Sequence, residues 1–265
     1  MVGEDGCVLK LIESIRNPEI QGLRKLAKAR ERHERGLYLI EGPRMAEEAV
    51  AAGVCQALYI SRTTDRIHEI AVAASQADIE VTAVSEVVME SLCETRTPQG
   101  IVCTCRINSE VELPRGPYIL AMDAVQNPGN VGTIIRTADA AGFSGVLLGP
   151  GCADLYGSKT LAATMGSVFH LKIKSVSDLS GTLMQYRDDG YAIIATELGG
   201  ADFYAACPAA PAVLVIGNEG NGISPDISGA ATHHLALPMR GGAESLNASV
   251  AAGIMIYEMI RRGKD

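Results

Sequence analysis

The spacing of apolar residues switches repeatedly between strand-like and helix-like periods along the chain. In the first part, short apolar runs predict strands at LYLIE, ALYI, IEVTAV and GIVCTCR. The amphipathic segments predict one helix from Pro18 to a stop at Gly36, and further helices over 42–53, 65–76 and 85–94. This pattern predicts a small α/β domain over residues 1–106.

The second part repeats the alternation with more strongly apolar strands. They are predicted at YILAMD, GVLLG, HLKI, YAIIAT, AVLVIG and HLALP, with helices over 130–141, 157–166, 178–187 and 245–262. Continuous apolar runs are typical of parallel strands buried on both faces. The segment INSEVELPRGP has two prolines and no apolar period, so it predicts a linker over 107–116. A second α/β domain with a parallel sheet is expected over 117–265.

Composition places the chain among globular proteins, with 265 residues of which 47% are hydrophobic and 20% charged. No apolar run reaches the roughly 20 residues that span a membrane, and MVGEDGCVLK lacks a signal-peptide pattern. The seven cysteines are scattered without zinc-finger spacing. These features predict a cytoplasmic protein with reduced thiols and no metal.

Charge is unevenly distributed in this acidic chain, whose net charge is −8. Between Arg16 and Arg35 there are seven Lys or Arg against three Glu, a local excess of +4. Taken alone, this stretch is most simply a solvated helix face with ion pairs. The overall charge argues against nonspecific coating of nucleic acid.

Three loops that follow predicted strands carry candidate chemistry, because ligands of such sheets collect at the carboxyl ends of strands. The first, MDAVQNPGNVGTIIRTADAAGF, leads into a helix predicted to begin near Val131. Asn130 can cap this helix, and Arg136 lies one and a half turns into it. A capped turn with an exposed arginine is the alternative to a site.

The second loop, VLVIGNEGNGISPDI, resembles phosphate-binding loops only superficially. Gly217 and Gly222 have Walker A spacing, but Ile223 stands where the lysine is needed, and the dinucleotide pattern G-x-G-x-x-G is missing. Glu219 within this turn would repel a pyrophosphate. A hydroxyl or an amine is a better partner for it.

The third loop, LPMRGGAESLNAS, precedes a helix predicted to begin near Glu244 or Ser245. Ser245 is as consistent with a helix N-cap as with a site residue. Asn247 is a poor residue for a first helical turn and is available for a ligand.

Together, NPGNVGTIIRTADAAGFSGV, VLVIGNEGNGIS and LPMRGGAESLNASVAAGIMIYE resemble the three ordered motifs of the SpoU/TrmH-type RNA ribose 2′-O-methyltransferases, of the SPOUT class. The match spans roughly residues 118–262. The stretch from Asn17 to Val50 is similar to the start of the substrate-binding domain often attached to these enzymes. The resemblance implies an N-terminal α/β RNA-binding domain and a C-terminal SPOUT domain with a parallel sheet and a trefoil knot.

The resemblance also implies S-adenosylmethionine as cofactor, an RNA substrate and a homodimer. Catalytic or positioning roles fall on Asn130, Arg136, Glu219, Ser245 and Asn247. The cofactor wall falls on Thr196, Ile216, Gly217, Asn218, Leu237, Met239 and Leu246. The basic stretch becomes an expected RNA contact through Arg24, Lys25, Lys28, Arg30, Arg32, Arg35 and Arg44.

Several alternatives stay open at this point. Arg136 is often proposed in the family to assist loss of the hydroxyl proton, yet a guanidinium stays protonated, so contact with an RNA phosphate is physically easier. Ribosomal RNA is the preferred substrate and transfer RNA the alternative. A nucleotide- or NAD-dependent enzyme and a noncatalytic RNA-binding protein are the rival functions.

Overall fold

The computed structural model describes residues 10–108 and 110–263, which form two compact units. Of the described residues, the first unit contains 10–108 and 156–161, and the second contains 110–155 and 162–263. The predictions about the N-terminal segment, including Cys7, lie outside the described residues.

The first unit is built on a mixed five-stranded sheet of order β1-β4-β3-β5-β2. Strands β1, β4 and β3 are parallel, while β5 runs antiparallel to both β3 and β2. The strands are β1 (Leu11–Ile12), β2 (Leu37–Glu41), β3 (Cys55–Ile60), β4 (Glu80–Val84) and β5 (Ile101–Arg106). The helices are α1 (Pro18–Lys25), α2 (Ala29–Arg35), α3 (Pro43–Ala51), α4 (Asp65–Gln76) and α5 (Glu86–Leu92). The four strands predicted here are confirmed, and β1 was missed.

The single N-terminal helix predicted from Pro18 to Gly36 is wrong, because the chain forms two helices, α1 and α2. The break is stabilised from within the fold. Arg32 is buried, with 6% of its surface exposed, and its guanidinium donates to the carbonyls of Leu26 and Ala27 at 2.7 and 2.9 Å. A buried cation thus satisfies the carbonyls that the interrupted helix leaves open.

The second unit contains a six-stranded, entirely parallel sheet of order β11-β9-β10-β6-β7-β8. Its strands are β6 (Tyr118–Met122), β7 (Gly145–Leu148), β8 (Ile173–Ser175), β9 (Ala192–Asp202), β10 (Ala212–Ile216) and β11 (His233–Ala236). The helices are α6 (Pro128–Ala141), the 3₁₀ turn η1 (Ser167–Phe169), α8 (Leu179–Asp188), α9 (Phe203–Ala206), α10 (Pro225–Ala230) and α11 (Ala248–Arg262). Helix α7 (Ser158–Thr164) is divided between the units, because residues 158–161 are grouped with the first. All six predicted strands are present, whereas α9, η1 and α10 were missed.

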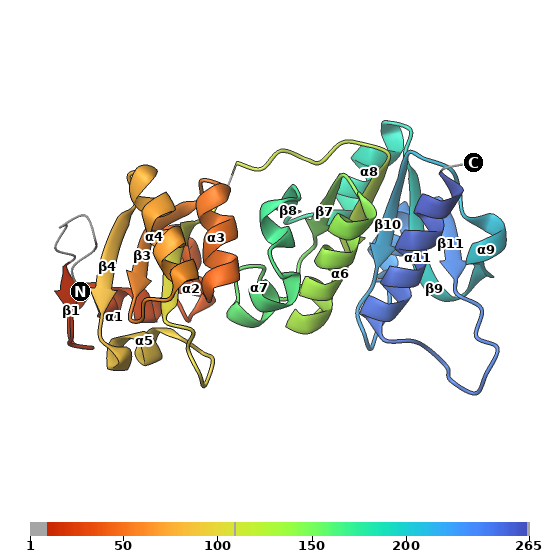
Figure 1. Cartoon of the computed structure of the whole chain (residues 1–265). Coiled ribbons are helices and arrows are strands. Elements are labelled where there is room, and N and C mark those ends of the chain that lie inside the picture. Colours follow the sequence, from red (N-terminus) through yellow and green to blue (C-terminus); the bar gives the residue numbers. More distant parts are fainter. Residues whose placement is uncertain (1–9, 109, 264–265) are drawn as a thin grey trace. The chain divides into compact units, whose positions relative to one another are not determined.

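Helices cover both faces of this sheet, as the continuous apolar strands require. One face packs on α8 and α10, with Ile119, Val213 and Leu183 in the same cluster. Leu120 and Leu214 alternate with these strand residues and are also fully buried. Helices α6 and α11 pack against each other, and Figure 1 shows α11 over the near side of β10 and β11.

The second half of the segment predicted as a linker, 107–116, forms hydrogen bonds and an ion pair with the second unit. The Tyr186 hydroxyl donates to the Pro114 carbonyl at 2.5 Å, and the Arg115 guanidinium pairs with Asp189. The backbone N–H of Gly116 donates to the Tyr191 hydroxyl. These contacts make residues 111–116 part of the second unit. No helix among the described residues is long and apolar enough to cross a membrane.

We expect Arg32→Ala to lower the free energy of unfolding by about 2–3 kcal/mol, because two carbonyls lose a charged donor. Chemical denaturation of the full chain measures this change. Arg30→Ala is the matched control, since Arg30 is exposed and forms a surface ion pair with Glu34 one turn away, and it should cost less than about 1 kcal/mol. Equal effects of the two substitutions would contradict the structural role of Arg32.

Candidate active site

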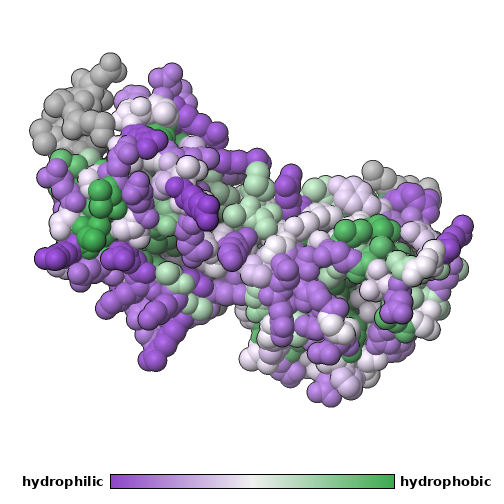
Figure 2. All heavy atoms as spheres, turned by 90° about the horizontal axis from the view of Figure 1, so that it is seen from below, coloured by the Kyte–Doolittle hydropathy of each residue, from purple (hydrophilic) through white to green (hydrophobic). Residues whose placement is uncertain are grey.

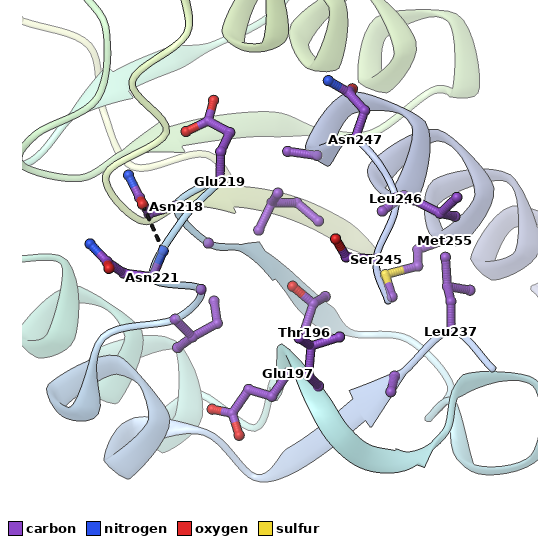
Figure 3. Close-up of a pocket in the computed structure, with 18 of the residues that line it drawn as sticks. Thr196, Glu197, Asn218, Glu219, Asn221, Leu237, Ser245, Leu246, Asn247 and Met255 are labelled. Atoms are coloured by element: carbon purple, nitrogen blue, oxygen red, sulfur yellow. Dashed lines mark hydrogen bonds between the residues drawn. The ribbon is translucent and has the colours of Figure 1, made fainter. Parts of the chain in front are cut away.

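A cavity of about 840 Å³ opens at the carboxyl ends of β10 and β11 and beside residues 196–198 of β9 (Figure 3). Its size suits a drug-sized or cofactor-sized ligand. All seven residues expected to form the cofactor wall line this cavity: Thr196, Ile216, Gly217, Asn218, Leu237, Met239 and Leu246. Of the five expected polar residues, Glu219, Ser245 and Asn247 line it, while Asn130 and Arg136 do not.

A chain of hydrogen bonds connects the three loops that the sequence singles out. The Asn130 side-chain N–H donates to Glu219 Oε1 at 2.9 Å, and the Asn247 side-chain N–H donates to Asn130 Oδ1 at 3.1 Å. Glu219 follows β10, Asn130 follows β6 and Asn247 follows β11. Residues more than 80 positions apart are therefore held in one polar cluster at the edge of the sheet.

The Glu219 carboxylate is the negative end of this cluster. It also accepts from the backbone N–H groups of Gln126 and Asn127, at 3.2 and 3.1 Å. Partial burial alone would raise the pKa of the Glu219 carboxyl, but the hydrogen bonds from Asn130 and these backbone donors outweigh it and hold the pKa below its ordinary value. Glu219 is therefore a charged acceptor at neutral pH.

The third loop differs from its prediction at the start of the helix. Helix α11 begins at Ala248, and its N-cap is Asn247, whose Oδ1 accepts from Ser249 and Val250 N–H at 2.9 and 3.3 Å. The predicted start at Glu244 or Ser245 and the capping alternative for Ser245 are wrong. Ser245 lines the cavity, and Figure 3 shows its hydroxyl on the cavity side.

The first loop is corrected in the same way. Asn127, not Asn130, caps α6 by accepting from the N–H groups of Gly129 and Asn130, and the helix begins at Pro128. Asn130 therefore does not cap the helix. Its side chain is buried and forms the hydrogen bonds to Glu219 and Asn247. Arg136 lies six residues further along α6, a rise of about 9 Å. It is exposed, and no described residue pairs with it.

Two polar residues hold the second loop in place, one from within it and one from the first loop. Asn218 donates to the Ala124 carbonyl at 2.8 Å and accepts from the N–H groups of Gly220 and Asn221, so its side chain is committed to the loop. Asp123, which sequence reasoning missed, is buried and accepts from the Ser224 N–H at 2.7 Å. An acid directly after a buried strand was the signal that could have identified it.

Gly217 is required by the close approach of the chain to itself. A Cβ atom at this position would lie 2.4 Å from the Gly222 carbonyl carbon. Because Gly217 has no side chain, the second loop can close into a tight turn, and the Gly217 backbone lines the cavity.

The charge of the cavity lining was not anticipated. Three glutamates line it, Glu197, Glu219 and Glu244, and none of the described lining residues is Lys or Arg. A lining of this sign favours a cationic ligand and disfavours the phosphates of a nucleotide. The described lining therefore offers no cationic side chain to an RNA phosphate.

The residues expected to contact RNA are placed in different ways on the first unit. Arg24, Lys25, Lys28 and Arg44 are exposed. Arg30 and Arg35 are exposed but form ion pairs with Glu34 and Glu31. Arg32 is a correction, because it is buried in the helix break described above. The stretch from Arg16 to Arg35 therefore contains both ion-paired arginines and exposed basic side chains without such a pair.

Cysteines and possible metal ligands are further sequence-predicted features of the described residues. The six described cysteines are free thiols. Within 10–108 and 110–263, no cluster of three or more His, Cys, Asp or Glu side chains is arranged to hold a metal ion.

The two roles of Asn247 can be separated experimentally. Asn247→Ala removes the cap of α11 and the contact with Asn130, and should lower the free energy of unfolding by about 1–2 kcal/mol. Asn247→Asp keeps an acceptor for the cap but loses the donor to Asn130, so it should retain more than half of that stability. Thermal or chemical unfolding measures both variants. Equal losses would show that the cap contributes little.

Comparison with known proteins agrees with these motifs. Residues 117–257 match the SpoU rRNA Methylase family, and residues 17–103 match the MRM3-like substrate binding domain. A relative from Bacillus subtilis (strain 168), the 23S rRNA (guanosine(2553)-2′-O)-methyltransferase RlmP, is 34% identical over 95% of this chain and 99% of its own.

Solved structures give the same result. The AdoMet-bound rRNA methyltransferase from Sinorhizobium meliloti is similar with a TM-score of 0.87 and 31% identity, over 96% of this chain and 98% of its own. The SpoU methyltransferase AviRb from Streptomyces viridochromogenes, in complex with AdoMet, has a TM-score of 0.83 and 26% identity, over 93% and 98%. The three ordered loops, the parallel sheet and these matches together establish that the chain belongs to the SpoU rRNA methylase family.

Proposed function

We propose that this protein transfers a methyl group from S-adenosylmethionine to a ribose 2′-hydroxyl of ribosomal RNA. The observation that carries the proposal is the cavity lined by the second and third motif loops, which the Glu219–Asn130–Asn247 hydrogen bonds connect to the first loop. The relative that methylates a 23S rRNA guanosine on its 2′-oxygen supports the choice of substrate. Transfer RNA is the alternative.

The cavity suits the proposed cofactor in shape and charge. Ile216, Leu237 and Leu246 offer apolar contacts for an adenine ring, and the backbone at Gly217 is accessible for hydrogen bonds. The net negative lining complements a sulfonium cation. The same lining counts against the rival nucleotide- or NAD-dependent function, because it would repel phosphates.

When bound, S-adenosylmethionine supplies an activated methyl group, so the protein mainly contributes alignment. Glu219, Asn130 and Asn247 hold the loops in register through their mutual hydrogen bonds. Ser245 has a hydroxyl at the cavity that no described residue engages, and we assign it to substrate or cofactor contact. Asn218 would contribute by shaping the loop, because its side chain bonds to the loop backbone and its own backbone N–H and C=O pair with Gly222. We propose that these same loops form the trefoil knot that the resemblance implies.

Arg136 is assigned to the acceptor nucleotide, and a second copy of the chain is proposed to bring it there. The lining lacks a cation, and Arg136 of the same chain lies outside it. Val250, Ile254 and Tyr257 form an exposed apolar stripe on α11, at 50%, 37% and 53% exposure. Figure 2 shows apolar side chains gathered on this unit. Burying this stripe in a homodimer would let each cavity receive Arg136 of the partner subunit.

The first unit is proposed to hold the RNA outside the reacting nucleotide. Arg24, Lys25 and Lys28 are exposed without a partner among the described residues, so they are available for phosphates. A local basic surface on an acidic protein favours a structured target over nonspecific binding. An RNA substrate and free thiols at the described cysteines support a cytoplasmic location.

Methyl transfer from labelled S-adenosylmethionine to ribosomal RNA, followed by nucleoside analysis, tests the proposal. We expect a 2′-O-methylated nucleoside with the wild-type protein and its loss, by at least 100-fold in rate, with Arg136→Ala. Cofactor binding by calorimetry should survive in the variant, because Arg136 is assigned to the acceptor nucleotide and does not belong to the residues that form the cofactor wall. Label on a base, or no transfer by a protein that binds RNA, would overturn the activity. A near wild-type rate for the variant would overturn the role of Arg136.

A further inference from the structure

A wide bulge in β9 forms one wall of the cavity. Strand β11 pairs with β9 at Ala195 and resumes at Ala201, so residues 196–200 have no partner in β11. Two glycines permit this path. Gly199 has φ of +85°, and a Cβ atom at Gly200 would lie 2.7 Å from the His234 carbonyl oxygen. The bulge is therefore specified by the sequence, and it brings Glu197 to the cavity.

Among the described residues, a hydrogen-bond partner fixes one carboxylate oxygen of Glu197 and leaves the other without one. Its Oε2 lies 3.1 Å from His234 Nδ1, and 27% of its side chain is exposed. No described residue donates to Oε1. The Glu219 carboxylate differs, since three donors from the first loop engage its two oxygens. Glu197 thus leaves a charged acceptor open toward the cavity, on the side away from Asn247 (Figure 3).

The chemistry of an open carboxylate selects its ligand. An ionised carboxylate only accepts hydrogen bonds, so it matches hydroxyl donors. Dinucleotide-binding enzymes use an acidic residue in this way for a ribose hydroxyl. The proposed cofactor carries a ribose with two adjacent hydroxyls. We propose that Glu197, oriented by His234 and the β9 bulge, binds the ribose hydroxyls of S-adenosylmethionine and selects for an intact ribose. This inference rests on the proposed function of the cavity.

Calorimetric titration of the full-length protein tests the assignment without depending on catalysis. The ligands are S-adenosylmethionine, its 2′-deoxy and 3′-deoxy analogues, and S-adenosylhomocysteine. For the wild type we expect at least one deoxy analogue to bind about tenfold more weakly than the intact cofactor, as loss of a charged hydrogen bond predicts. Glu197→Ala should bind the cofactor about tenfold more weakly and discriminate between cofactor and deoxy analogues by less than twofold.

Two further variants isolate the cause. Glu197→Gln keeps the size of the side chain and one acceptor oxygen, so it should retain part of the discrimination. Asp188→Ala removes an exposed acid at the end of α8, outside the cavity lining, and should leave both affinity and discrimination unchanged. A folded Glu197→Ala variant, checked by circular dichroism, excludes a loss through unfolding.

Each remaining outcome points to a specific error. Full discrimination by Glu197→Ala, or none by the wild type, would overturn the ribose assignment. Loss of the preference for the cofactor over uncharged-sulfur S-adenosylhomocysteine, with ribose discrimination intact, would show that Glu197 acts on the sulfonium instead. Failure of the wild type to bind S-adenosylmethionine at all would overturn the proposed function and, with it, this inference.

Discussion

The hydrogen-bonded chain from Glu219 through Asn130 to Asn247 is the interaction on which the site depends. Its polarity is fixed at both ends. A carboxylate can only accept, so the Asn130 amide must present its N–H groups to Glu219 and its oxygen to Asn247. The Asn247 oxygen is fixed in turn by the N–H groups that begin α11. One arrangement of donors therefore joins three loops that are distant in sequence.

The sheet explains why these loops can meet. When strands are buried on both faces, ligands can reach them only near their ends, and the carboxyl ends of parallel strands lie along one edge of the sheet. Strands β9, β10 and β6 are neighbours, so the second loop lies between the first loop and the β9 bulge. The resulting cavity carries three glutamates and no described Lys or Arg in its lining. That negative charge matches a sulfonium cofactor. A cationic side chain that contacts the substrate would have to come from outside this lining.

Much of this arrangement could be predicted from the sequence, because it rests on local patterns. Apolar runs identify the six strands of the second unit, and the three polar loops follow from their ends. The errors lie where particular side-chain contacts or strand register, and not apolar periodicity, decide the local structure. The break between α1 and α2 depends on buried Arg32, and the exact start of α11 depends on Asn247 rather than Ser245. The β9 bulge depends on its register with β11, which no periodicity reveals.

A double-mutant cycle on Asn130 and Asn247 tests most directly whether the hydrogen-bonded chain makes one site from three loops. Calorimetry would give the affinity for S-adenosylmethionine of Asn130→Ala, Asn247→Ala and the double variant. If the chain acts as a unit, the loss of binding free energy in the double variant should fall short of the sum of the single losses by about 1 kcal/mol or more. Additive losses would contradict the account, because they would mean that each asparagine supports the cavity independently.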